Sequence, residues 1–103
     1  MSAAIGKHVQ IRGEIYAEEE LTMDGDFEGK IEVLHKLTIG PNGTIKASVK
    51  AREVVVAGKI DGDVEASDRI SIQNGAHITG DLKTASILID DGAYFKGGID
   101  IVH

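Results

Sequence analysis

The chain has 103 residues and no cysteine, which fits one domain and excludes a disulfide framework and a thiolate metal site. Its net charge is −6 without any basic stripe, so it is a poor candidate for binding nucleic acid, where phosphate contacts supply most non-specific affinity. No apolar run approaches the ~18 residues of a membrane span, and the first residues lack the features of a signal peptide. We therefore expect a soluble, cytoplasmic protein.

Similar segments of 16 or 17 residues follow one another along the whole chain. They begin near residues 5, 21, 37, 54, 70 and 87, and apolar and polar residues alternate within each. Alternation is typical of strands with one buried face, and a fixed period of this kind is typical of a solenoid. The sequence therefore predicts an all-β parallel solenoid of about six rungs, in a single domain over residues 1–103.

The aligned segments form columns of similar residues. Three inward columns hold large apolar side chains: Ile5, Leu21, Leu37, Val54, Ile70 and Ile87; Ile11, Phe27, Ile45, Ile60, Ile78 and Phe95; Ile15, Ile31, Val49, Val64, Leu82 and Ile99. A further column holds small residues: Gly13, Gly29, Ala47, Gly62, Gly80 and Gly97. Small residues suit a corner with little inner volume, and glycine also permits the bend.

Two outward columns carry charges that mostly alternate in sign. They read Arg12, Glu28, Lys46, Asp61, Thr79 and Lys96, and Tyr16, Glu32, Lys50, Glu65, Lys83 and Asp100. Neighbouring rungs would lie ~4.8 Å apart, where opposite charges attract and like charges repel. This pattern supports the alignment, and six such rungs predict a rod about 29 Å long.

Turn signals separate the strands and explain the unequal segment lengths. The third, fifth and sixth segments each carry two extra residues, within Gly40–Gly43, Gln73–Gly75 and Asp90–Gly92. Asn-Gly and Asp-Gly sequences favour tight bends, so we expect a bulged corner there.

Two kinds of β-helix compete for this pattern. A left-handed hexapeptide helix, often found in trimeric acyltransferases, needs an inward residue every six positions and eighteen residues a turn. The inward spacing here is irregular, as in Leu37, Ile39, Ile45, Ala47, Val49 and Val54. The sequence therefore favours a right-handed parallel β-helix with about three short faces.

Several phrases together are similar to the core of bactofilins. They lie at residues 13–15, 21–31, 37–45, 54–64 and 75–82, and the resemblance covers residues 5 to 101. It implies a bacterial cytoskeletal protein that polymerises without nucleotide into non-polar filaments. Such proteins act in cell shape, in polar structures and as scaffolds for cell-wall enzymes. Members often carry flexible tails, some of which touch the membrane. Only four residues precede the first predicted rung, so direct membrane binding is doubtful and a place at the inner face of the membrane stays open.

The two ends of the predicted rod are the candidate functional sites. At one end Ile5, Val9 and Ile11 would face the end of the core, and at the other Phe95, Ile99 and Ile101. Unpaired strand groups at each end template pairing with another chain, so we expect a homopolymer through the terminal rungs. The sequence alone leaves the polarity of that polymer open.

No catalytic, cofactor or metal constellation stands out in the sequence. The histidines His8, His35, His77 and His103 fall at different column positions, and the glycines form no phosphate-binding loop. We therefore expect a protein that is not an enzyme and has no cofactor. Two alternatives remain: a monomeric β-helical module that binds a cell-wall enzyme or glycan, and an acyltransferase-type trimer.

Overall fold

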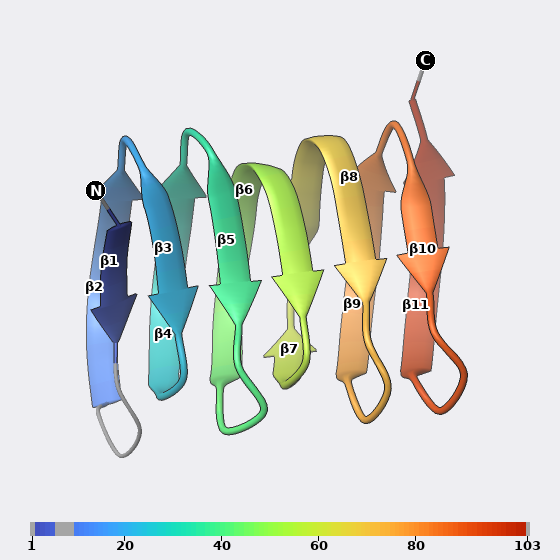
Figure 1. Cartoon of the computed structure of the whole chain (residues 1–103), viewed down its shortest axis with the longest axis horizontal. Coiled ribbons are helices and arrows are strands. Elements are labelled where there is room, and N and C mark those ends of the chain that lie inside the picture. Colours follow the sequence, from blue (N-terminus) through green and yellow to red (C-terminus); the bar gives the residue numbers. More distant parts are fainter. Residues whose placement is uncertain (1, 6–9, 103) are drawn as a thin grey trace.

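The computed structural model describes residues 2–5 and 10–102, which form eleven strands and no helix. The strands are β1 (Ser2–Ile5), β2 (Gln10–Ala17), β3 (Glu20–Met23), β4 (Asp26–Val33), β5 (Lys36–Ile39), β6 (Thr44–Val56), β7 (Lys59–Asp61), β8 (Val64–Ile72), β9 (His77–Thr84), β10 (Ile87–Ile89) and β11 (Tyr94–Ile101). Every pairing among these strands is parallel, and together they form one coiled sheet (Figure 1).

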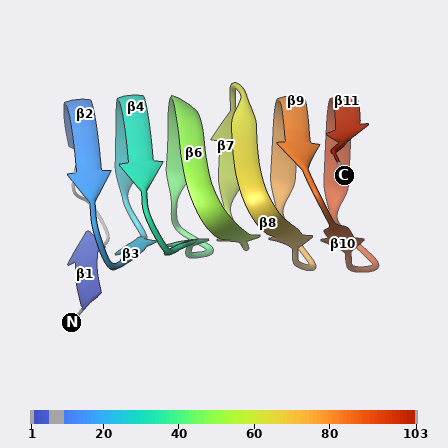
Figure 2. The same cartoon turned by 90° about the horizontal axis from the view of Figure 1, so that it is seen from above.

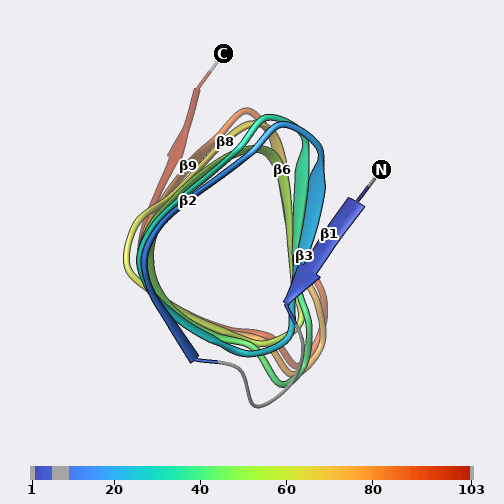
Figure 3. The ribbon, with the colours of Figure 1, turned by 90° about the vertical axis from the view of Figure 1, so that its left-hand side faces the viewer.

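The coil is three-sided in cross-section (Figure 3). The first face holds the N-terminal parts of β2, β4, β6, β9 and β11, together with β7. The second face holds the parts of β2, β4, β6, β9 and β11 that follow, together with the start of β8. The third face holds β1, β3, β5, β10 and the C-terminal ends of β6 and β8, and its arrows point down at the front of Figure 1.

The solenoid is right-handed. Seen from the N-terminal end, the chain runs clockwise as it recedes from the viewer (Figure 3). About five turns separate the first strand of the third face from the last, through Ala3, Leu21, Leu37, Val54, Ile70 and Ile87. The longest dimension is 31 Å, close to the predicted rod, and the two termini lie at opposite ends of the stack (Figure 2). The left-handed alternative is therefore wrong.

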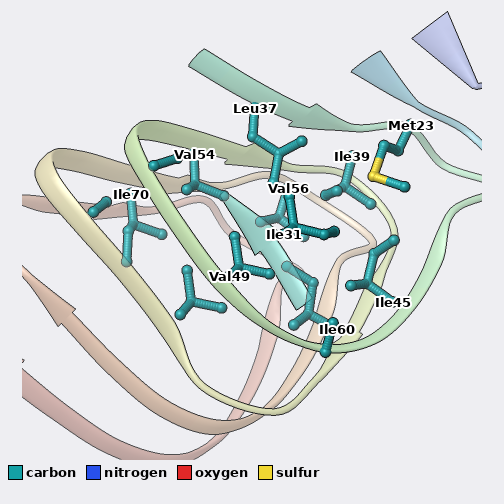
Figure 4. Packing of buried hydrophobic residues seen from close by; sticks show 14 of the residues in the cluster. Met23, Ile31, Leu37, Ile39, Ile45, Val49, Val54, Val56, Ile60 and Ile70 are labelled. Carbon is teal, nitrogen blue, oxygen red and sulfur yellow. The ribbon is translucent and has the colours of Figure 1, made fainter. Parts of the chain in front are cut away.

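The core is a narrow column of apolar side chains that stack like on like along the axis. Leu37, Ile39, Ile45, Val54 and Ile70 are fully buried. Figure 4 shows these side chains directed into the common interior from successive rungs. The three predicted inward columns supply most of this core, because alternation places every second residue of each strand inside.

The strand register agrees with the predicted columns from the second rung onward. Phe27 pairs with Ile45, for example, and Gly80 pairs with Gly97. The first column is wrong at its first member: Ala3, not Ile5, pairs with Leu21, and Ile5 pairs with Met23. Ala3 and Ile5 lie two residues apart in β1, so the alternation of the sequence alone does not distinguish them as the partner of Leu21.

The extra residues form the predicted turns between the third and first faces. At each, an amide donates to the carbonyl three residues earlier: Gly43 to Gly40 at 2.9 Å, Ala76 to Gln73 at 3.0 Å, and Ala93 to Asp90 at 3.2 Å. The ladder also contains a register shift that the sequence did not predict, between Ala51 and Glu53 where β6 pairs with β8. It lies at a different corner, between the second and third faces.

Candidate polymerisation surface

The C-terminal end of the solenoid exposes apolar side chains that are buried one rung earlier. Ile99 is 41% exposed, whereas its partner Leu82 on β9 is 1% exposed. Ile89 is 49% exposed, whereas its partner Ile72 on β8 is 1% exposed. β8 and β9 are each covered by a following strand, β10 and β11, whereas β10 and β11 have no following strand in the described chain. The last rung therefore offers an apolar surface shaped to accept one more layer.

Five other residues complete this surface. Ile101 and Val102 are exposed, while Ile87, Ala93 and Phe95 are half-buried and pack against the core. The three residues predicted for this end, Phe95, Ile99 and Ile101, thus lie together on β11. Ile89 was missed by the sequence prediction, although its column of Met23, Ile39, Val56 and Ile72 contained the signal.

The N-terminal end is less completely described. Three residues of β2 are half-buried and pack against the core: Ile11, Ile15 and Ala17. Ile5 lies on β1 opposite Met23, and Val9 lies outside the described residues. β1 and β2 pair on one side only, with β3 and β4, among the strands of the structure. One edge of each therefore keeps unpaired backbone groups, as expected for the start of the stack.

The two charge rows predicted from the sequence follow the strand register along the stack. On the first face, Nε of Arg12 and Oε2 of Glu28 are 3.5 Å apart and form an ion pair. Both side chains are largely exposed. A third alternating row, not predicted from the sequence, runs along the third face through Glu20, Lys36, Glu53 and Arg69. Exposed pairs of this kind contribute about 0.2–1 kcal/mol each, so they fix register more than they add stability.

Among the described residues the structure offers no group of three or more His, Asp or Glu side chains that could hold a metal ion. None of the described segments is a helix long and apolar enough to cross a membrane. Two open grooves of about 570 and 620 Å³ run along the second face on either side of the row Glu32, Lys50, Glu65 and Lys83. The most distinctive surface is thus the open end.

The comparisons with known proteins show the family of this chain. The family model described as "Bactofilin: Polymer-forming cytoskeletal" matches residues 3–100. The chain belongs to the bactofilin family. Its stacked parallel rungs are therefore those of a family described as polymer-forming and cytoskeletal.

Three curated relatives come from Myxococcus xanthus (strain DK1622). Bactofilin BacO is 35% identical over 97% of this chain and 79% of its own length. Bactofilin BacN is 35% identical over 94% of this chain and 86% of its own length. A third, bactofilin BacP, is 28% identical over 97% of this chain but only 42% of its own length.

A solved structure has the same fold. It is a cryo-EM reconstruction of Thermus thermophilus bactofilin double helical filaments. It matches with a TM-score of 0.91 and 25% identity, over 97% of this chain and 99% of the other. This bactofilin therefore shares its right-handed solenoid with a relative whose subunits form filaments.

Proposed function

We propose that this bactofilin assembles end to end through its terminal rungs into a filament that needs no nucleotide. The observation that carries the proposal is the exposure of Ile89 and Ile99 at positions where the preceding rung is buried. Fully burying an Ile side chain is worth about 1.5–3 kcal/mol, so several such residues drive association. A second molecule also pairs the free edges of β10 and β11. At the N-terminal end we assign the same role to Ile5, Val9 and Ile11.

We further propose that the subunits alternate in direction, which makes the filament non-polar. A head-to-tail joint continues the register of β11 into β2 of the next molecule, and this places Arg12 beside Lys96. That contact breaks the alternation of the row and costs up to about 1 kcal/mol. Joints between like ends are isologous and avoid the contact.

In the cell, such a filament would act as a cytoplasmic scaffold, placed at the inner face of the membrane or at a pole. It would support cell shape or position cell-wall and other morphogenetic proteins, and it would carry out no catalysis. The family match and the filament of the Thermus relative support the scaffold, and the recruited partners follow only from the family's known roles.

The substitution Phe95→Arg tests the joint. It places a charge in a contact that excludes water, where the effective penalty is several kcal/mol. Since about 1.4 kcal/mol corresponds to a factor of ten, the critical concentration should rise at least about a hundredfold. Sedimentation and negative-stain electron microscopy should show filaments of the parent without added nucleotide and short oligomers of the variant.

Two further variants make the test decisive. Phe95 packs against the core, whereas Ile99 is exposed, so Ile99→Arg should block assembly without disturbing the fold. Leu34→Arg is the matched control, because Leu34 is 47% exposed at a corner away from both ends. The proposal fails if the parent stays monomeric at high concentration, if it forms a discrete trimer, or if Leu34→Arg impairs assembly as much as Ile99→Arg.

A further inference from the structure

Two turns of the solenoid contain the dipeptide Asn-Gly. Asn42-Gly43 lies between β5 and β6, and Asn74-Gly75 lies between β8 and β9. In this dipeptide the glycine nitrogen can attack the side-chain amide carbon of the asparagine, because glycine has no Cβ to hinder the approach. Asparagine is a thermolabile residue for this kind of reason. Neither turn belongs to the polymerisation surface, and the surroundings of the two differ.

The first turn holds both of its residues in place. Oδ1 of Asp24 accepts a hydrogen bond from the backbone amide of Asn42 at 3.0 Å, and Oδ2 of Asp24 accepts one from Nδ2 of Asn42 at 3.3 Å. Gly43 is buried, and its amide donates to the carbonyl oxygen of Gly40 at 2.9 Å. Attack by the Gly43 nitrogen therefore requires a buried hydrogen bond to break first.

The second turn is open to solvent. Asn74 and Gly75 are both exposed, and a Cβ at Gly75 would meet nothing within 4 Å. The Gly75 amide donates outside its own turn, to the carbonyl oxygen of Gly92 on the last rung, at 3.3 Å. The turn closes without this bond, because the Ala76 amide donates to Gln73. The Gly75 nitrogen thus becomes free whenever the last rung lifts, and terminal elements open most easily.

We propose that Asn74 is a site of spontaneous deamidation and that Asn42 is not. The nitrogen of Gly75 bonds to Cγ of Asn74 while the bond from Cγ to Nδ2 breaks, and ammonia leaves with the proton of the Gly75 amide. The product is a succinimide. Water then adds to one of its two carbonyl carbons: opening at Cγ gives aspartate, and opening at the main-chain carbon gives isoaspartate. A water molecule is consumed and an ammonia molecule is released, without oxidation or reduction.

The last rung shows that a turn of this kind accepts the aspartate product. Asp91-Gly92 takes the same place between β10 and β11, and the φ of Gly92, 86°, matches the 87° of Gly75. This turn also closes through its own hydrogen bond, from the Ala93 amide to Asp90 at 3.2 Å. Aspartate therefore leaves the backbone of the turn unchanged.

Both products nevertheless weaken the contact with the last rung. The side chain of Asn74 lies against this rung, since a Cβ at Gly92 would collide with its Oδ1. A carboxylate there lies one rung from Asp91, where like charges repel. Isoaspartate runs the main chain through Cβ and Cγ, and this extra carbon disturbs the closing bond of the turn and the bond to Gly92. The last rung carries Ile89 and Ile99 of the polymerisation surface.

Deamidation therefore acts on free subunits, a consequence that rests on the end-to-end assembly proposed above. In a free subunit the last rung pairs only with β8 and β9 among the described strands. In the filament the next subunit covers it and keeps the Gly75 nitrogen bonded. A subunit that stays free converts Asn74 and then joins a filament less readily. A polymer that needs no nucleotide thus has a chemical step that separates old subunits from new ones.

The test measures conversion by peptide mass spectrometry after incubation in water enriched in heavy oxygen. Conversion during the incubation leaves a heavy oxygen atom in the product, so conversion during later handling is not counted. In folded Ile99→Arg, which should stay unpolymerised, Asn74 should convert at least about tenfold faster than Asn42, because the buried Gly43 hydrogen bond must break before attack. In denaturant the two should convert at similar rates, since each precedes a glycine.

This measurement does not depend on assembly. Absence of conversion at Asn74 in the folded protein, equal conversion at Asn42, or a difference that persists in denaturant would overturn the assignment of the site.

The consequence for assembly has its own test. Asn74 should convert several-fold more slowly in parent filaments than in Ile99→Arg. Parent subunits aged below the critical concentration should then need a higher concentration to assemble than fresh ones. Asn74→Ser cannot form the succinimide, so its aged and fresh samples should assemble alike. Asn42→Ser is the matched control and should age as the parent does. Circular dichroism checks that each sample is folded.

The outcomes separate this inference from the proposed function. Equal loss of assembly in aged parent and aged Asn74→Ser, or equal conversion in filaments and free subunits, would overturn the link between Asn74 and assembly. Absence of any fresh parent filament would overturn the proposed function and leave the measured conversion of Asn74 intact.

Discussion

At the scale of single residues, the corner between the first and second faces depends on glycine. Gly80 has a φ of 134°, in the region that side chains avoid, and a Cβ there would collide with the carbonyl oxygen of Gly62 on the rung before. The close approach of consecutive backbones leaves no room for a neighbour to shift. The small-residue column therefore reflects both the bend and the spacing of the rungs.

Gly80→Ala should lower the free energy of unfolding by at least 1–3 kcal/mol, roughly the cost of an unfavourable φ alone, because the clash adds to it. Gly75→Ala is the matched control: its φ is 87°, but a Cβ there meets nothing within 4 Å. Chemical denaturation of both variants, in the polymer-blocked Ile99→Arg background, measures the difference. Equal losses would mean that the approach of the two backbones contributes nothing.

At the scale of strands, in-register stacking turns each outward column into a row of charges with a spacing set by the backbone. Three such rows alternate in sign, one on each face, and two of them were visible in the sequence. The sequence did not predict the row of Glu20, Lys36, Glu53 and Arg69, because each member lies just before the apolar residue that begins a repeat. The structure thus extends a rule that the sequence already contained.

Glu65 lies between Lys50 and Lys83 in its row. Glu65→Lys makes three neighbouring positions of the row positive and should destabilise the fold by about 0.5–1 kcal/mol at low salt. High salt should remove most of this loss, since exposed charges are screened. Asp68→Lys makes the same charge change at the corner between the second and third faces, outside the rows, and should have a smaller effect. Thermal melting at two salt concentrations provides the measurement.

The sequence predicted the architecture well because stacking repeats one pattern many times. Every inward column from Leu21 onward recurs on five rungs, so an error in one copy conflicts with the others. The first copy had no earlier neighbour to correct it, and a misplacement by two residues leaves the alternation of a strand unchanged. The register shift beside Arg52 was also not predicted, because Ser67 and Asp68 lack the Asn-Gly or Asp-Gly pair that indicated bulged corners.

The candidate site was predictable for a similar reason. Phe95, Ile99 and Ile101 fall at inward positions of the last copy, so the repeat itself indicates that they lack a covering layer. How much of each side chain reaches solvent could not be predicted. Phe95 is half-buried because it packs against the core, whereas Ile99 is exposed.

At the scale of the whole molecule, protection should follow distance from the ends. Strands in the middle of the stack, such as β5 and β6, have a rung on each side, whereas β11 pairs with β9 alone among the described strands. Terminal elements with few contacts open most easily. The last rung is therefore expected to open more easily than the middle of an isolated subunit.

Hydrogen exchange should detect this difference. In Ile99→Arg, which should stay unpolymerised, amides of β10 and β11 should exchange much faster than those of β5 and β6. In parent filaments the same β11 amides should become protected by pairing with the next subunit, with little change in the middle strands. Equal exchange of β11 in both samples would contradict a joint at this end.

The alternating rows also have a consequence for how such a chain can lengthen over evolutionary time. Along a row the sign of the charge repeats every two rungs, whereas the backbone fold repeats every rung. Duplication of a single rung would leave the core continuous and place two like charges side by side, whereas duplication of two rungs preserves both. Genes for solenoids of this kind should therefore gain or lose rungs in pairs.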